Sequence, residues 1–193
     1  VMAFDAFGQI LSKIDNSIFF ESDFFKKLQG KNDFITTGNN IRGIFSEINL
    51  SLEYLIREFG IIYDIKADFE NNTFNVDKFV DNNSKCGYLN ATVSNYSEVA
   101  DIDRLYSGVK VGFRNWQSES KLKGLEYNSI RTYESQMNFG SRELDLVSEF
   151  ITSGYVIEEY RRFQFDETEK LKEHKLDNSI FLNVERTNDM DIP

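Results

Sequence analysis

Residues 51–80 carry a helix pattern followed directly by a strand pattern, and this pairing limits the fold more than any other stretch of the chain. The i, i+3, i+4, i+7 spacing of an amphipathic helix is met by Leu52, Leu55, Ile56 and Phe59. Ser51 is a suitable N-cap, and Gly60 is a suitable residue at which to end a helix. We therefore predict a helix over 52–59.

Apolar and polar residues then alternate along 61–69 and again along 73–80, which is the pattern of half-buried strands. The intervening residues, 70–72, are Glu-Asn-Asn, a sequence typical of a turn. The two runs together predict a β-hairpin.

Other periodic segments add short helices and strands to this unit. Helices are predicted over 3–14, over 22–28 with Ser22 as N-cap, from Ser97 to before Gly108, and over most of 147–162. For 141–165, one helix and a strand followed by a helix both stay open. Strands are predicted at 89–93, 109–113 and 180–184, and turns or loops at 36–40, 81–85, 117–126 and 166–175. Residues 127–137 favour a strand by composition but have no clean buried face, which is typical of an edge strand.

Helices and strands do not alternate regularly along the chain. This order favours an α+β fold, with mostly antiparallel sheets and several short helices, over a doubly wound α/β fold. Hydrophobic residues make up 40% and aromatic residues 15% of the chain, which is enough for a packed core. We expect residues 1–193 to form one unit, with two lobes (1–105 and 106–193) as the alternative.

The chain contains one cysteine, Cys86, and one histidine, His174, and these counts limit its chemistry. A disulfide within the chain is impossible, and the two residues alone cannot form a Cys/His zinc site. A catalytic triad would have to use His174, which lies in a charged run and is expected to be solvated. No Gly-rich phosphate-binding motif occurs. The residue pattern therefore indicates no catalytic residue, no metal site and no cofactor.

The richest acidic stretch, from 64 to 77, has oxygen-bearing side chains at alternate positions, as the first half of a calcium loop does: Asp68, Glu70 and Asn72. The sixth position of such a loop requires glycine and here is Thr73. The twelfth requires glutamate and here is Phe79. The turn of a hairpin is therefore the favoured interpretation of these residues.

The net charge of the chain limits the kinds of partner that it can bind. The chain has 32 acidic and 22 basic side chains and a formal net charge of -10. Because nucleic-acid-binding surfaces are basic, this balance argues against nucleic acid as a partner. No apolar run reaches the length of about 18 residues that a transmembrane helix needs, so no membrane span is expected.

Several segments resemble, in order and spacing, a family of virion proteins from tailed phages and prophages of Bacteroidetes. One is Tyr-Ser-Gly-Val-Lys-Val-Gly-Phe-Arg-Asn-Trp at 106–116. The others are 22–25, 35–43, 50–61, 124–133, 144–148, 153–158 and 177–181, so the resemblance extends over nearly the whole chain. A helix that ends in Phe-Gly-Ile and leads into a hairpin is also similar to the organisation of tail-hub or baseplate domains.

The resemblance implies a non-enzymatic structural protein of a phage tail or baseplate. It implies that the protein is made in the bacterial cytoplasm and resides in the virion, where its partners are copies of itself and other virion proteins. It also implies that the chain is part of a longer protein. The family carries no catalytic residue over to this sequence.

Assemblies of this kind use aromatic side chains as anchors. The candidates, in or beside the segment without a clean buried face, are Trp116, Tyr127, Tyr133 and Phe139. Each of these side chains could instead lie in the core of the protein. For Trp116, the core is the favoured position. Two other functions stay open: a bacterial surface or accessory module that binds carbohydrate or protein, and, more remotely, a carboxylate-based hydrolase.

Overall fold

The computed structural model describes residues 1–27, 29–79, 105–114, 130–135, 142–173 and 179–184, and the statements below concern these residues. Its helices are α1 (Ala3–Ile14), α2 (Asp23–Lys27), α3 (Gly38–Ile41), α4 (Leu52–Tyr63) and α5 (Gly154–Phe163), with a short 3-10 helix η1 (Gln29–Asn32). Its strands are β1 (Phe19–Glu21), β2 (Asp33–Thr36), β3 (Ile65–Glu70), β4 (Thr73–Lys78), β5 (Gly108–Phe113), β6 (Arg131–Glu134), β7 (Glu143–Ser148) and β8 (Ile180–Asn183). This mixture of short helices and small sheets confirms the predicted α+β class.

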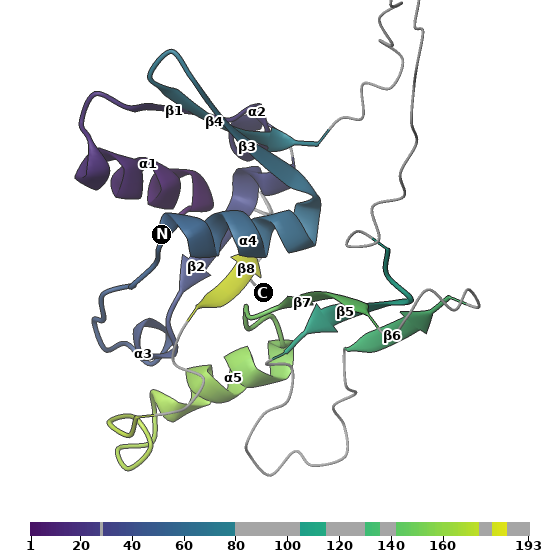
Figure 1. Ribbon diagram of the computed structural model, residues 1–193. Helices are drawn as coiled ribbons and strands as arrows, with labels where there is room; N and C mark the ends of the chain where they lie inside the picture. The colour runs from purple at the N-terminus through teal and green to yellow at the C-terminus, as the bar shows by residue number, and fades with distance from the viewer. Residues whose placement is uncertain (28, 80–104, 115–129, 136–141, 174–178, 185–193) are drawn as a thin grey trace, which may run out of the picture.

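The strands form three small sheets, in the orders β1-β4-β3, β2-β8 and β6-β5-β7 (Figure 1). The β3/β4, β2/β8 and β5/β6 pairs are antiparallel, whereas β1/β4 and β5/β7 are parallel. Other elements separate both parallel pairs in the sequence, because parallel strands cannot be joined by a tight turn.

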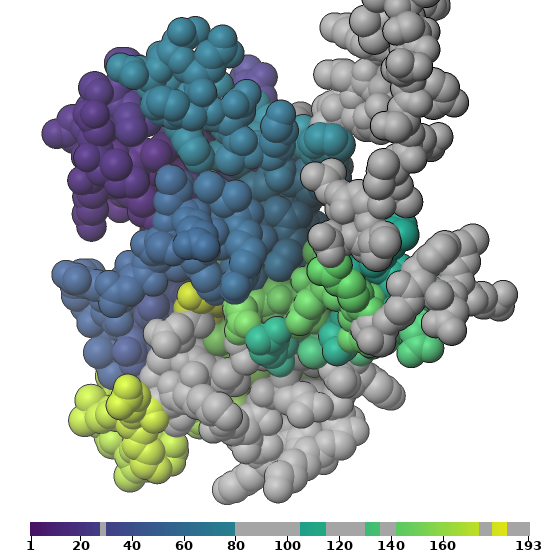
Figure 2. Space-filling model, viewed as in Figure 1, coloured from purple at the N-terminus to yellow at the C-terminus, as the bar shows by residue number. Residues whose placement is uncertain are grey.

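An aromatic core lies between α1, α2 and α4, and Figure 2 shows these elements packed as one continuous body with the β3/β4 hairpin. Phe59 of α4 is its centre: its ring lies 6.0 Å from that of Phe7 in α1 and 5.0 Å from that of Phe25 in α2. From the second half of the chain, Phe150 and Phe181 approach the same ring at 5.5 and 5.8 Å. Edge-to-face ring contacts add to the stabilisation that apolar burial supplies. Both halves of the chain therefore share one core.

Helix α4 begins where predicted and ends later. The Ser51 hydroxyl accepts a hydrogen bond from the backbone N–H of Tyr54 at 3.1 Å, which confirms Ser51 as the N-cap. The prediction that Gly60 ends the helix is wrong. The helix continues to Tyr63, and Asp64 ends it in a left-handed conformation with φ 55°. Since Tyr63 follows Phe59 by four residues, the added turn places a second ring on the core face.

The predicted hairpin is confirmed, with its first strand shortened by the extension of α4. Strands β3 and β4 pair with Glu70 opposite Thr73, and Asn71 and Asn72 form the two-residue turn between them. Both asparagines have positive φ, 51° and 60°. A type I′ hairpin turn requires this conformation, and asparagine tolerates it better than most residues.

Residues 141–165 differ from the prediction of a helix over most of 147–162. Residues 143–148 form β7, parallel to β5, and α5 starts only after Ser153, whose hydroxyl is its N-cap. Leu144 and Leu146 also fit the two-residue period of a strand. Pairing with β5, which is distant in the sequence, decides between the two periods.

The turn predicted at 36–40 is also wrong. Thr36 is the last residue of β2 and lies opposite Ile180 of β8. Thr37 is the N-cap of α3, and its hydroxyl accepts a hydrogen bond from the backbone N–H of Asn40 at 3.2 Å. The same residue types form turns and cap helices, so the local sequence could not separate the two structures.

Some of the remaining predictions are confirmed, and the others mostly concern residues outside the described ranges. The helices expected over 3–14 and 22–28 are α1 and α2, and the strands expected at 109–113 and 180–184 are β5 and β8. The elements and residues outside the described ranges are 81–85, 89–93, residues 97–104 of the helix expected from Ser97, 117–126, Cys86 and His174. Residues 105–107, the end of that expected helix, are described and are not helical. No helix in the described part of the chain is long and apolar enough to cross a membrane.

Candidate interaction surface

Strand β6 is an edge strand that is exposed on both faces. The sheet order gives it one neighbour, β5, and Figure 1 shows it at the outer side of the sheet. All four of its residues are exposed, and Tyr133 retains 58% of its accessible surface. The edge strand expected within 127–137 is therefore confirmed for the residues that the structure describes.

One face of the β6-β5-β7 sheet is apolar. Val109 of β5 lies between Tyr133 of β6 and Leu144 of β7 in one row across the sheet. In the next row on the same face, Val111 lies between Leu146 of β7 and Arg131 of β6. Side chains of one row, and of every second row, point to the same side of a sheet. The valines and leucines form an apolar strip, and at the β6 edge it is bordered by the exposed side chains of Tyr133 and Arg131.

The opposite face is charged. Lys110 Nζ lies 3.2 Å from Glu143 Oε2, and Arg114 Nη1 lies 2.7 Å from Glu149 Oε1. Arg114 Nη2 also approaches Asp145 Oδ2 at 3.5 Å. Exposed ion pairs contribute little stability individually, but their charges favour contact with water. One face of the sheet therefore carries the ion pairs, and the other carries the apolar strip.

The free edge of β6 also presents backbone groups. Ser135 donates its N–H to the carbonyl oxygen of Ser107 at 2.7 Å, so these two residues form a hydrogen-bonded pair. Such pairs alternate along an antiparallel ladder. The N–H of Tyr133 therefore points toward β5, whereas those of Thr132 and Glu134 point away from the sheet. An edge with outward N–H and C=O groups is a template for another strand.

Glu58 attaches this sheet to α4, and Figure 2 shows the green residues of the sheet packed directly against the blue residues of α4. The Glu58 side chain is fully buried, and its Oε2 accepts hydrogen bonds from Ser148 Oγ and Glu149 N–H, each at 2.7 Å. Arg57 donates to Oε1 from Nε at 3.0 Å and from Nη2 at 2.7 Å. Sequence reasoning missed this role, although Glu58 follows Leu55 by three residues and so lies beside the buried stripe.

Of the four predicted anchors, Tyr133 lies on this surface. Trp116, Tyr127 and Phe139 lie outside the described residues. Among the candidates that the structure describes, Tyr133 is thus the exposed aromatic side chain at the sheet edge.

Asp33 is a second buried carboxylate that the sequence did not indicate. It is fully buried in β2, and its Oδ1 accepts hydrogen bonds from the Tyr63 hydroxyl at 3.0 Å and the Asn183 amide at 2.8 Å. Burial raises the pKa of Asp33, and the two donated hydrogen bonds offset part of the rise. Full burial separates both Asp33 and Glu58 from a substrate in solution.

The acidic residues of the hairpin do not gather around a common point. No group of three or more His, Cys, Asp or Glu side chains within the described ranges is arranged to hold a metal ion. Asp68 and Glu70 are exposed strand residues next to the confirmed turn.

Comparisons of the chain with protein-family models, with curated proteins and with solved structures found no match.

Proposed function

We propose that this chain is a non-enzymatic structural protein that acts through protein–protein assembly, and that β6 is one of its contact edges. The observation that carries the proposal is the exposure of all four β6 residues on an edge strand. Exposed edges template the addition of another strand, and shortness and charge reduce this tendency. Strand β6 is four residues long and carries Arg131 and Glu134, so a contact through it is weak in isolation. A neighbouring strand added to β6 would pair with its outward backbone groups and cover Tyr133.

The resemblance to virion proteins supports the choice of a phage tail or baseplate as the assembly. The partners would then be copies of this chain and other virion proteins. Symmetric particles repeat one contact around a ring or along a helix. A short edge strand that gives a weak contact in isolation is therefore sufficient when it is repeated.

Light scattering coupled to size-exclusion chromatography, over a range of protein concentrations, tests self-assembly. Thr132→Pro removes one outward N–H at an edge position, where proline is tolerated. We expect it to weaken association about tenfold, because a strand contact depends on its few backbone hydrogen bonds. Thr132→Ala retains the N–H and is the matched control, expected to associate as the unmodified chain does. Tyr133→Ser tests the aromatic contact separately.

Two results would contradict the proposal. A chain that stays monomeric at every concentration, with fast hydrogen exchange at Thr132 and Glu134, would rule out self-assembly through β6. Equal association of the proline and alanine variants would show that the contact lies elsewhere.

A further inference from the structure

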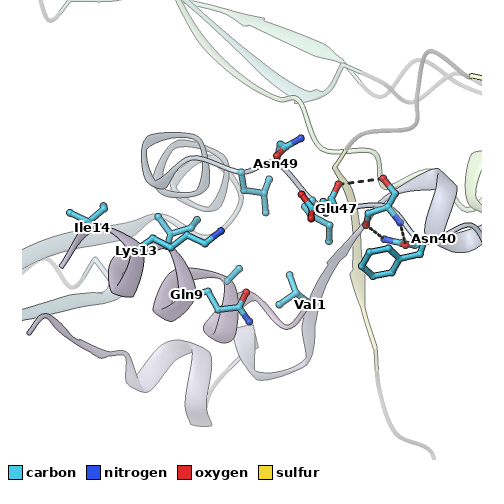
Figure 3. A pocket seen from close by; sticks show the side chains of 13 residues that line it. Val1, Gln9, Lys13, Ile14, Asn40, Glu47 and Asn49 are labelled. Atoms are coloured by element: carbon cyan, nitrogen blue, oxygen red, sulfur yellow. Dashed lines mark hydrogen bonds between the residues drawn. The ribbon is translucent and has the colours of Figure 1, made fainter. Parts of the chain in front are cut away.

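A second surface lies on the opposite side of the molecule from β6, between α1 and residues 45–50, which lead into α4 (Figure 1). A pocket of about 570 Å³ opens there, with Gln9 and Lys13 of α1 on one wall and Glu47 and Asn49 on the other (Figure 3). We call this pocket the α1 groove. Its volume is within the range of sites that hold small ligands or short peptide segments.

Residues 45–50 belong to no helix or strand and have no strand partner among the described residues. The burial of their side chains alternates: Ile48 packs against the core, whereas Phe45, Glu47 and Asn49 are exposed. This two-residue period is that of a β-strand. The backbone N–H groups of Glu47, Ile48 and Asn49 nevertheless form no hydrogen bond with any residue that the structure describes.

Asn40 holds this segment in place. Its Nδ2 donates to the carbonyl oxygen of Ser46 at 3.1 Å, and the N–H of Ser46 donates to Asn40 Oδ1 at 3.0 Å (Figure 3). The side-chain amide thus pairs with the backbone in both directions, as a neighbouring strand would. A segment that is already held in place loses less conformational entropy when a second strand pairs with it.

Apolar side chains flank the α1 groove from both walls. Phe45 is 90% exposed, and Ile14 at the end of α1 is 63% exposed. Ile10 and Ile48 also line the groove. A bound peptide would therefore meet apolar side chains from α1 and from residues 45–50.

Two charged side chains of opposite sign, Lys13 and Glu47, line facing sides of the groove. Figure 3 shows the Lys13 side chain reaching into the groove from α1, with Glu47 on the facing segment. Neither side chain forms an ion pair with another described residue. A ligand that brings a carboxylate to Lys13 is complementary to this arrangement, and a second acid beside Glu47 is not.

We propose that the α1 groove binds an extended peptide segment of another polypeptide by β-strand addition. The peptide pairs with the backbone of residues 47–49, and one of its acidic side chains forms an ion pair with Lys13. Backbone hydrogen bonds supply affinity in this mode, and alternate side chains supply specificity. This surface is separate from β6, so the inference does not depend on assembly through that edge.

Selection from a displayed library of random octapeptides, against the intact 193-residue chain, tests the inference. We expect enriched peptides with alternating apolar residues and an aspartate or glutamate. Their binding should shift the backbone amide NMR signals of residues 45–50 and of α1. Lys13→Glu should weaken binding about tenfold or more. Lys66→Glu, on the exposed side of β3, makes the same charge change and should leave binding unaltered.

Two further experiments test the ion pair and the backbone pairing separately. Replacing the peptide's acidic residue with lysine should restore its affinity for the Lys13→Glu variant. Asn49→Pro, which removes one N–H, should abolish binding, whereas Asn49→Ala should not, with thermal unfolding confirming that both variants are folded. The inference is overturned if no peptide is enriched, if the shifted signals lie outside the groove, or if the Lys13 and Lys66 variants bind equally.

Discussion

Glu58 and Ser148 are joined by a 2.7 Å hydrogen bond across 90 positions of the sequence. Ser148 Oγ donates to Glu58 Oε2, and the backbone N–H of Glu149 donates to the same oxygen at 2.7 Å. Because α4 carries the acid, while Ser148 ends β7 and Glu149 follows it, the sheet that presents Tyr133 is attached to α4 at this point. This buried carboxylate and the core ring of Phe150 together hold the end of β7.

Glu58→Gln is expected to lower the free energy of unfolding by about 2–3 kcal/mol. The amide NH₂ must face either Ser148 and Glu149 or Arg57, and a donor then meets a donor in both orientations. Chemical denaturation measures the loss. Glu53→Gln, at an exposed position in the first turn of the same helix, is the control and should cost less than about 1 kcal/mol. Equal losses would contradict the buried contact.

Substitution by alanine is expected to destabilise the protein at Gly30 and to stabilise it at Gly8. A Cβ on Gly30 would lie 2.6 Å from ring atoms of both Phe24 and Phe25, which are buried. Gly30→Ala should therefore cost about 1–3 kcal/mol through overpacking. A Cβ on Gly8, inside α1, meets nothing within 4 Å, so Gly8→Ala should gain about 0.5–1 kcal/mol of helix stability. Thermal unfolding of the two variants checks the opposite signs.

Arg42 is expected to hold the chain that follows α5. Its side chain is 1% exposed, and Nε and Nη2 donate to the carbonyl oxygens of Lys170 and Lys172, both at 3.3 Å. The guanidinium also lies 5.3 Å from the ring centroid of Tyr160. Lysine cannot reproduce this planar set of donors. Arg42→Lys should cost about 2–3 kcal/mol and speed hydrogen exchange over 166–173.

The matched control for Arg42 is Arg161→Lys, on the exposed surface of α5. Arg161 pairs with Glu158 at 2.6 Å, and both side chains are solvent-exposed. An exposed pair contributes at most about 1 kcal/mol. A loss at position 42 no larger than that at position 161 would contradict the structural role of Arg42.

Asp33 is expected to make stability depend on pH. Burial raises the pKa of this carboxyl in the folded state above its unfolded value, so the folded protein binds the proton more tightly. The contribution of Asp33 to the free energy of unfolding therefore falls as pH rises from the ordinary carboxyl pKa through the raised one. Asp33→Asn removes this titration while keeping an oxygen that can accept from Tyr63 and Asn183.

Urea denaturation of both proteins between about pH 4 and pH 7 measures the effect. The free energy of unfolding of the asparagine variant, minus that of the unmodified protein, should increase with pH. Carboxylates common to both proteins cancel in this difference. A difference that stays constant or shrinks would contradict the raised pKa.

Helix starts and the hairpin turn could be predicted because their chemistry is local. Ser22 and Ser51 accept hydrogen bonds from N–H groups three residues ahead, at 3.1 Å in both cases. Asn71 and Asn72 supply the positive φ of the turn. None of these features needs a distant partner, and all of them follow from residue types a few positions apart.

The candidate surfaces could be predicted less completely. Tyr133 was identified because its segment lacks a buried face, a pattern visible in the sequence itself. The α1 groove left no such sign, because Lys13 and Glu47 come from elements that only the fold places opposite each other. Glu58 and Asp33 were missed for the same reason, since their hydrogen-bond donors lie far along the chain.

Capping, periodicity and turn chemistry are local, so they predict the α+β class, the amphipathic helices and the hairpin. Contacts between distant residues set where α4 ends, make residues 143–148 a strand, and leave the edge of β6 exposed. Ile61 and Ile62 are compatible with a helix or a strand, and the aromatic contacts of Tyr63 select the helix. In each case the local preferences were nearly balanced, so the free energy of pairing or burial against distant residues made the choice.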